Sequence, residues 1–268
     1  LIGVGDSVGL QIVAVDREGK PSSEPVTAQL SIERRWNEQV KIKSDNGRIS
    51  VRNESHDEKL GTQEITITPA DVNAGGLVIP FAPTKPGRHT LTFTGTDSTG
   101  VPFRTAIIHH IYGTDEYPWA YESGMKIKLV PEKPNFKPGE NARILVLSPI
   151  EGTALITLER EGVQTHFIRE LRADNPVIEF PLTDANAPNV FASVLVIKGA
   201  RDNKREVKEP ILRLGYCELT VVNKRDRLAV EITKPAESYR PGTEVALAGS
   251  VASADGKPAA GAEVTLYA

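Results

Sequence analysis

The sequence of 268 residues predicts an all-β chain made of consecutive β-sandwich modules. A short signature occurs twice, as Phe136-Lys137-Pro138-Gly139 and as Tyr239-Arg240-Pro241-Gly242, and each copy precedes a run in which apolar residues alternate. A second echo links the two ends of the chain, because Gly5 and Gly242 are each followed, after the same interval, by Gly-Lys-Pro. Such internal repetition indicates an array of related modules, with starts near residues 3, 125 and 228.

The repeated signatures have a local physical cause. Proline fixes φ and glycine accepts positive φ, so Pro-Gly turns the chain sharply just before a strand. The segment Asp255-Gly256-Lys257-Pro258 has the composition of a hairpin turn between two strands. These motifs therefore indicate a fold and carry no chemistry of their own.

Composition agrees with a folded β protein and narrows the range of partners. With 39% apolar and 25% charged residues, the chain can bury two or more cores. Its 32 basic and 35 acidic residues leave a net charge of −3, which provides no electrostatic basis for binding nucleic acid. The longest apolar stretches, such as Ala106-Ile107-Ile108, are far too short for a membrane span, so no transmembrane segment is expected.

The first module is expected over residues 1–113 as an immunoglobulin-like or fibronectin type III-like sandwich. Apolar residues alternate with polar residues at 63–68 and at 89–94, as in strands with one buried face. No helix is expected, and many short strands separated by turns are typical of a sandwich. The expected strands are 8–15, 26–32, 40–43, 48–51, 64–68, 77–81, 90–94 and 101–111.

Residues 114–124 break this pattern and form the expected linker. The stretch is polar and contains a proline, but it also holds Tyr117, Trp119 and Tyr121, more aromatic residues than a flexible tether needs. We expect these aromatic side chains to pack against one or both flanking modules. The alternative is a partly exposed loop.

The second module, expected over residues 125–223, carries motifs whose order is specific. Its expected strands are 125–131, 144–147, 154–160, 165–171, 177–181, 190–198 and 216–222. The signature at 136–139 is followed by Ser148-Pro149-Ile150-Glu151-Gly152, Leu158-Glu159-Arg160-Glu161-Gly162-Val163, Ala187-Pro188-Asn189-Val190-Phe191 and Leu214-Gly215-Tyr216. In this order the motifs resemble the macroglobulin-like domains of the bacterial alpha-2-macroglobulin family. The resemblance is strongest over residues 125–268 and weaker over residues 1–113.

The resemblance implies both a fold and a function. The family is built from strings of seven-stranded, fibronectin-like macroglobulin domains, followed by a protease-sensitive bait region and a thioester domain. Cleavage of the bait triggers a rearrangement that exposes the thioester, which captures or encloses the protease. Residues 224–268 would then be the first strands of a truncated third macroglobulin-like domain. Because the chain opens at Leu1 and stops inside an expected strand, it is expected to be a fragment of a longer protein.

The single cysteine limits what the chain is expected to do alone. The thioester of the family needs Cys-Gly-Glu-Gln, whereas the chain has Cys217-Glu218-Leu219-Thr220, so no covalent trap is expected within these residues. Cys217 has no second cysteine for an internal disulfide. It is expected to be a small, inward-facing strand residue rather than a reactive thiol.

No catalytic, cofactor-binding or metal-binding residue is expected. The five histidines, at positions 56, 89, 109, 110 and 166, lack metal-ligand spacing, and His109 and His110 should point to opposite faces of one strand. Calcium loops, nucleophile elbows and phosphate-binding glycine loops are not found. The mixed charges of Glu33-Arg34-Arg35 and of residues 201–206 are typical of a solvated strand end and a long loop. The chain is therefore not expected to be an enzyme.

Two functions from different classes remain. The first is a structural scaffold of a broad-spectrum endopeptidase inhibitor, as the resemblance implies. Its partners would be host or competitor endopeptidases, met through the full-length parent, and the neighbouring domains of the same chain. A bacterial periplasm or cell surface is the implied location, with lipid anchoring through a missing N-terminus as an option. The second is a generic extracellular binding or spacer array of the adhesin type.

Overall fold

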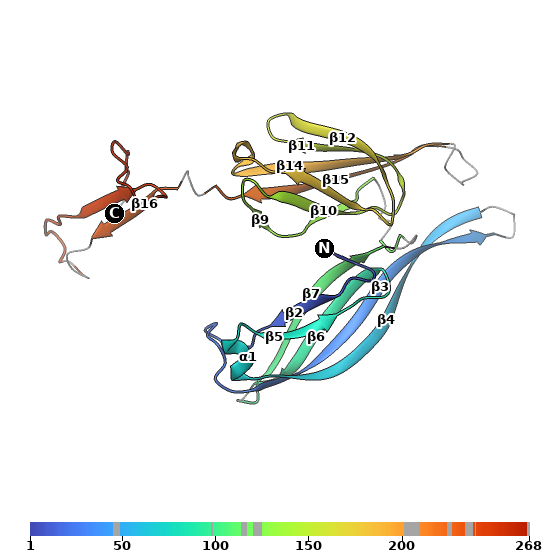
Figure 1. The fold of residues 1–268 in the computed structure, drawn as a ribbon, viewed down its shortest axis with the longest axis horizontal. Helices are drawn as coiled ribbons and strands as arrows, with labels where there is room; N and C mark the ends of the chain where they lie inside the picture. Colours follow the sequence, from blue (N-terminus) through green and yellow to red (C-terminus); the bar gives the residue numbers. More distant parts are fainter. Residues whose placement is uncertain are drawn as a thin grey trace.

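Two β-sandwiches and a separate two-stranded sheet follow one another along the chain in the computed structural model (Figure 1). The structure describes residues 1–44, 49–97, 99–113, 117–119, 125–200, 209–223, 227–233, 238 and 240–266. Strands dominate these residues, which confirms the all-β prediction. No helix in the described part of the chain is long and apolar enough to cross a membrane.

The first sandwich packs a five-stranded sheet against a two-stranded one. The larger sheet has the order β1 (Ile2–Gly3), β7 (Pro102–Tyr112), β6 (Gly87–Thr96), β3 (Val26–Lys43) and β4 (Ile49–Ile67). The smaller sheet pairs β2 (Val8–Ile12) with β5 (Leu77–Phe81). Because side chains alternate between the two faces of a strand, the core is built from residues on one face of each sheet. Its buried members include Ala28, Leu30, Ile65, Ile67, Phe81, Leu91 and Ile111.

The second sandwich packs a five-stranded sheet against a three-stranded one. The larger sheet has the order β12 (Val163–Leu171), β11 (Gly152–Glu159), β14 (Asn189–Lys198), β15 (Ile211–Val221) and β9 (Asn135–Phe136). The smaller sheet contains β13 (Val177–Pro181), β10 (Asn141–Leu147) and β8 (Lys128–Pro131). The core holds apolar residues from both sheets, among them Phe136, Ile144, Ile156, Phe180, Val194 and Leu219.

The two sandwiches repeat one topology, as the internal echoes predicted. In each, a two-residue strand pairs in parallel with the last long strand, β1 with β7 and β9 with β15. A turn follows in which a glycine has positive φ, with values of 90° at Gly5 and 87° at Gly139. The same turn recurs at Gly242, where φ is 81° and the amide of Thr243 donates to the carbonyl of Arg240. The signature therefore sets up an equivalent β-turn at three places.

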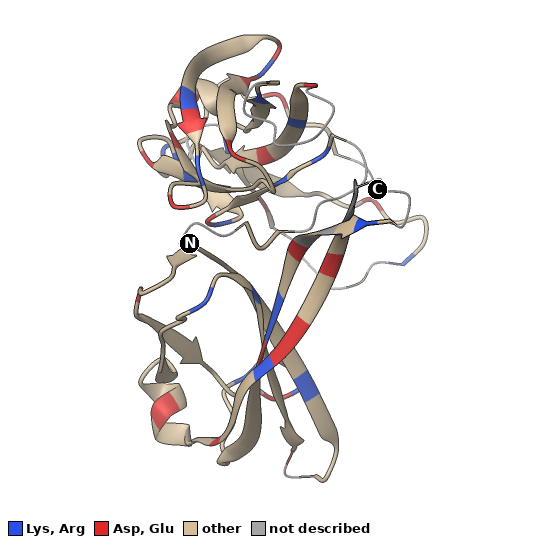
Figure 2. Cartoon of the chain, turned by 90° about the vertical axis from the view of Figure 1, so that its right-hand side faces the viewer, with Lys and Arg blue, Asp and Glu red and all other residues tan. Residues whose placement is uncertain are grey.

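The largest difference from the expected strands lies in β3 and β4. We expected four short strands at 26–32, 40–43, 48–51 and 64–68, but two continuous strands of 18 and 19 residues are present. β6 pairs with β3 only from Ala28 to Arg35, so the rest of the hairpin is a two-stranded ribbon. These outer strand residues could not be predicted from apolar alternation, because neither face of the hairpin there belongs to a sandwich core and its sequence is polar. We call residues 36–43 and 49–56 the free ribbon (Figure 2).

Two short helical turns also correct the expectation of no helix. The helix α1 (Pro69–Asn73) is capped by Thr68, whose hydroxyl accepts from the Asp71 amide, while the Asp71 carboxylate accepts from the Thr68 amide. This reciprocal pair is a capping box, and proline fits the first helical position. A 3₁₀ turn, η1 (Asp184–Asn186), lies between β13 and β14. Both turns are too short to show the repeating apolar pattern by which a helix is recognised in a sequence.

The third segment is a lone pair of antiparallel strands, β16 (Ala229–Thr233) and β17 (Ala248–Ala252). The alternating apolar run that follows the signature at 239–242 becomes a strand only from Ala248, where β17 begins. Among residues 227–233, 238 and 240–266, none is buried. The hairpin turn predicted around Asp255 is confirmed: the Ser253 amide donates to the Lys257 carbonyl, as the Asp16 amide does to the Lys20 carbonyl.

Candidate functional site at the junction of the sandwiches

The junction between the sandwiches is built on Tyr117, Pro118 and Trp119. The Trp119 side chain is only 9% exposed and clusters with Leu145 and Leu147 of β10. Leu1 and Tyr112, from the first sandwich, pack against the same cluster. The prediction that the linker aromatics pack is therefore confirmed for Tyr117 and Trp119. Tyr121 cannot be assessed, because residues 114–116 and 120–124 lie outside the described residues.

Tyr117 binds the second sandwich through its hydroxyl group. The hydroxyl accepts a hydrogen bond from the Ala173 amide at 3.2 Å and donates to the Glu151 carboxylate at 3.3 Å. Lys198 also donates to Glu151, at 3.0 Å, and holds the pKa of that carboxyl below its ordinary value. Burial, followed by the charge of Glu151, raises the pKa of Tyr117 to about 12. The hydroxyl therefore stays protonated and able to donate at physiological pH.

The free ribbon of the first sandwich holds the same segment from the other side. Beyond Arg35, the outer edge of β3 has lost β6 as a partner, and an unpaired strand edge needs to be covered. The Asn37 amide donates to the Pro118 carbonyl at 3.0 Å, and the Asn37 side chain donates to it at 3.3 Å. Ser55 of β4 donates to the Asn37 side-chain oxygen at 2.6 Å and fixes its orientation. Residues 117–119 are thus held by both sandwiches.

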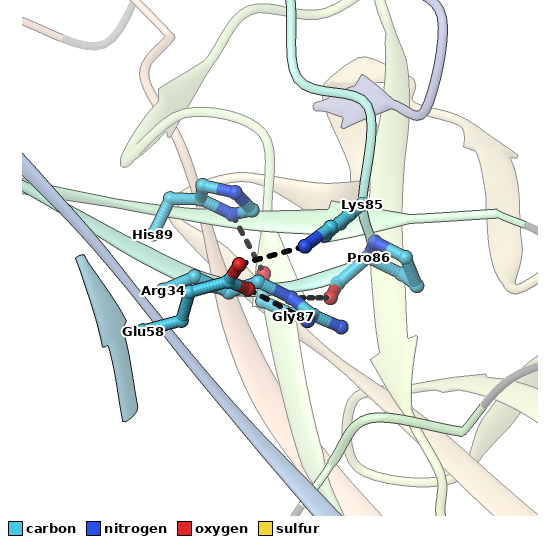
Figure 3. A network of polar contacts seen from close by, with 6 residues as sticks. All are labelled: Arg34, Glu58, Lys85, Pro86, Gly87 and His89. Atoms are coloured by element: carbon cyan, nitrogen blue, oxygen red, sulfur yellow. Dashed lines mark hydrogen bonds and ion pairs between the residues drawn. The ribbon is translucent and has the colours of Figure 1, made fainter. Parts of the chain in front are cut away.

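Arg34 anchors the free ribbon to the body of the first sandwich (Figure 3). Its Nε donates to the Pro86 carbonyl at 2.7 Å, and its Nη1 lies 3.4 Å from the Glu58 carboxylate. Lys85 also donates to Glu58, at 2.7 Å, and lowers the pKa of that carboxyl. The prediction of a solvated strand end is therefore wrong for Arg34, whose side chain is 7% exposed, and holds for Arg35, at 52%. Strand alternation turns Arg34 toward the interior.

A buried histidine on β6, His89, lies beside a half-buried histidine on β7, His109. His89 and His109 are directly opposite in the strand register, and each ring lies about 6 Å from the ring of Phe81, at 6.0 and 5.9 Å. Both Nε2 atoms are buried and find no hydrogen-bond partner among the described residues. Burial is the main cause that lowers the pKa of each imidazole. His110 points the other way, toward Trp119 at 5.8 Å, which confirms the predicted opposite orientation.

Cys217 occupies the position expected from the sequence. Its side chain is half-buried and packs against the core of the second sandwich. Burial raises the pKa of the Cys217 thiol to about 12, so the reactive thiolate is strongly disfavoured. The expected loop at residues 201–206, by contrast, lies outside the described residues.

The structure also brings together three side chains that sequence reasoning missed. Donor atoms of Glu38, Glu54 and His56 lie within 4.8 Å of one another on the free ribbon. Metal-binding motifs that can be recognised in a sequence have their ligands at fixed short spacings on one segment. These three come from two strands, and only the register of the hairpin places them side by side.

Comparison with known proteins adds a family match and several partial likenesses. A family model described as the alpha-2-macroglobulin bait region domain matches residues 127–268. The alpha-2-macroglobulin of Pasteurella multocida (strain Pm70) is 29% identical over 111 residues, which are 41% of this chain and 6% of that protein.

Solved structures give weaker likenesses. The crystal structure of Salmonella alpha-2-macroglobulin reacted with methylamine has a TM-score of 0.37 and 16% identity, covering 94% of this chain and 15% of that one. A bacterial ice-binding adhesin has a TM-score of 0.26 and 11% identity, covering 85% of this chain and 62% of that one. The chain spans only a small part of the length of both alpha-2-macroglobulins that it matches.

Proposed function

Because the chain belongs to the alpha-2-macroglobulin family, we propose that it is a structural scaffold within a broad-spectrum endopeptidase inhibitor that works as a protease trap. The observation that carries the proposal is the match of the bait region domain to residues 127–268, more than half of the chain. The proposed partners are endopeptidases and neighbouring domains of the same protein. The proposed location is a bacterial periplasm or cell surface.

The proposed division places macroglobulin-like sandwiches at 1–113 and 125–223, a linker at 114–124 and the start of a third domain at 224–268. The equivalent strand orders of the two sandwiches support it. In this arrangement, residues 117–119 hold the first two domains together as one unit. Such a unit transmits a movement from one end to the other, because neither sandwich can turn without breaking the contacts of Trp119 and Pro118.

The scaffold role assigns no chemical step to these residues. Cys217 is followed by Glu218, Leu219 and Thr220 and is half-buried, so it is unsuited to form the thioester of the family. Capture of a protease would depend on other parts of the full-length protein. The chain by itself is therefore proposed to be neither an enzyme nor an inhibitor.

The experiment measures protection of a large protein substrate from several endopeptidases by the full-length protein. A trap encloses the protease, so digestion of the large substrate should fall at equimolar ratio, while a small peptide substrate that still reaches the enzyme is cleaved. The 268-residue chain alone is the control and should protect neither substrate. Unchanged digestion of the large substrate by every protease would overturn the trap proposal and favour an adhesin-type spacer array.

A further inference from the structure

We propose that Glu38, Glu54 and His56 form a binding site for a divalent transition-metal ion, with Zn²⁺ as the best-suited ion. The site lies on the free ribbon and goes beyond the scaffold function proposed above. It also departs from the expectation, drawn from the sequence, that the chain holds no metal site.

The register of the hairpin brings the three ligands onto one face. Glu38 is directly opposite Glu54, and His56 is opposite Trp36, one same-face position further along the ribbon. The His56 Nε2 lies 3.2 Å from Glu38 Oε1, and all three donor atoms fall within 4.8 Å of one another. Zn²⁺ bonds of about 2.0–2.1 Å in tetrahedral geometry separate donor atoms by about 3.3 Å. Small rotations of the flexible glutamate side chains would bring the three donor atoms from their present separations to this distance.

The carboxylates of Glu38 and Glu54 lie directly opposite each other, and a bound cation would reduce the repulsion between them. Like charges at opposed positions of an antiparallel pair are destabilising. Arg52 offers partial compensation, since its Nε lies 3.7 Å from Glu54 Oε1, but its side chain is 69% exposed. Such an exposed pair contributes little and leaves Glu54 free to turn toward a metal ion.

The ring of His56 is held in a fixed position with one nitrogen next to Glu38. The His56 side chain is 34% exposed, but its Nε2 is buried, lies 3.2 Å from Glu38 Oε1 and makes no hydrogen bond among the described residues. The ring is held in place by stacking on Trp36, with centroids 5.1 Å apart and planes 23° apart. Trp36 in turn lies under the guanidinium of Arg34, 4.1 Å from the ring centroid. A fixed imidazole nitrogen beside two carboxylates is the arrangement that a metal ion completes.

The donor set selects the kind of ion. An imidazole with carboxylates suits Zn²⁺ and its transition-metal neighbours, whereas Mg²⁺ and Ca²⁺ prefer sites made of oxygen alone. Three protein ligands leave a fourth position for water. Asn37, which donates to Pro118, lies between Trp36 and Glu38 in β3. A bound ion would therefore cross-link β3 to β4 beside the contact with the linker.

The test is titration of the 268-residue chain with Zn²⁺ by calorimetry, with Co²⁺ absorption in the visible range as the report of the ligand set. E38Q, E54Q and H56Q should each weaken Zn²⁺ binding about tenfold or more. E64Q and H166Q remove one exposed carboxylate and one exposed histidine elsewhere and should leave binding unchanged. One ion per chain is expected, with Co²⁺ bands that are lost in H56Q.

The glutamate variants keep the proposal falsifiable if H56Q disturbs its stack on Trp36. E38Q and E54Q preserve side-chain size, and their circular dichroism should match that of the unchanged chain. If both stay folded and bind Zn²⁺ as tightly as the unchanged chain, or if H166Q weakens binding equally, the site is overturned.

Discussion

Replacing Trp119 with alanine should release the two sandwiches from each other without unfolding either one. The Trp119 side chain is 9% exposed, and neither sandwich core includes it. A tryptophan buries about 150–250 Å², which at about 25 cal/mol per Å² corresponds to about 4–6 kcal/mol. Alanine keeps the first carbon and its neighbours can partly relax, so we expect a loss of about 3–5 kcal/mol. This free energy is lost from the contact between the sandwiches and not from the stability of either core.

Hydrogen exchange at the Asn37 amide measures this loss directly, because that amide donates to the Pro118 carbonyl. If the junction opens locally, a loss of about 3–5 kcal/mol should accelerate exchange in W119A on the order of 10²–10⁴-fold. F191A is the matched control, since Phe191 is an aromatic residue that is 42% exposed on β14. An Asn37 exchange rate in W119A within about twofold of the rate in F191A would refute the claim that Trp119 holds the junction closed.

Three further predictions test the interior of each sandwich. Burial lowers the folded-state pKa of His89 and His109 below the ordinary 6.5, so the unfolded state binds more protons below pH 6.5. The free energy of unfolding is therefore highest above pH 6.5. It falls as the pH drops below this value, by at most about 1.4 kcal/mol per pH unit for each histidine. Urea unfolding at several pH values should show this dependence on pH, and H89Q should make it weaker. R34M should cost about 1–3 kcal/mol because it leaves the buried Pro86 carbonyl unpaired, whereas R35M, which removes an exposed pair, should not change the urea midpoint measurably. Iodoacetamide at pH 8 should label Cys217 slowly in the folded chain and quickly in urea, since burial raises its pKa to about 12; equal rates would show that the thiol is accessible.

Local alternation predicted the strands that border a core. The bounds of β13 (Val177–Pro181) and β5 (Leu77–Phe81) were predicted correctly, because their apolar residues alternate with polar ones and their ends carry turn residues. The free ribbon could not be found in this way. Its strands are stabilised by backbone pairing and by pairs such as Trp36 with His56, which leave no apolar period in the sequence.

The junction was predictable only in part. Three aromatic residues within the linker indicated packing, and Trp119 confirms it. The partner Asn37 gave no signal, because its contact with Pro118 joins residues far apart in the sequence. The same holds for Glu38 and His56, which meet only through hairpin register. Arg34 was misjudged because charge favours solvent, while strand alternation and the Pro86 carbonyl favour burial.

Whether these sandwiches are the scaffold of a protease trap can be tested by following the shape of the full-length protein during its first proteolytic cut. Native electrophoresis and small-angle scattering would be recorded at limiting protease, with the cut located by mass spectrometry. For a protease trap we expect one early cut outside residues 1–223, accompanied by compaction, while both sandwiches stay intact. First cuts inside the sandwiches, or scattered cuts without any change of shape, would contradict it.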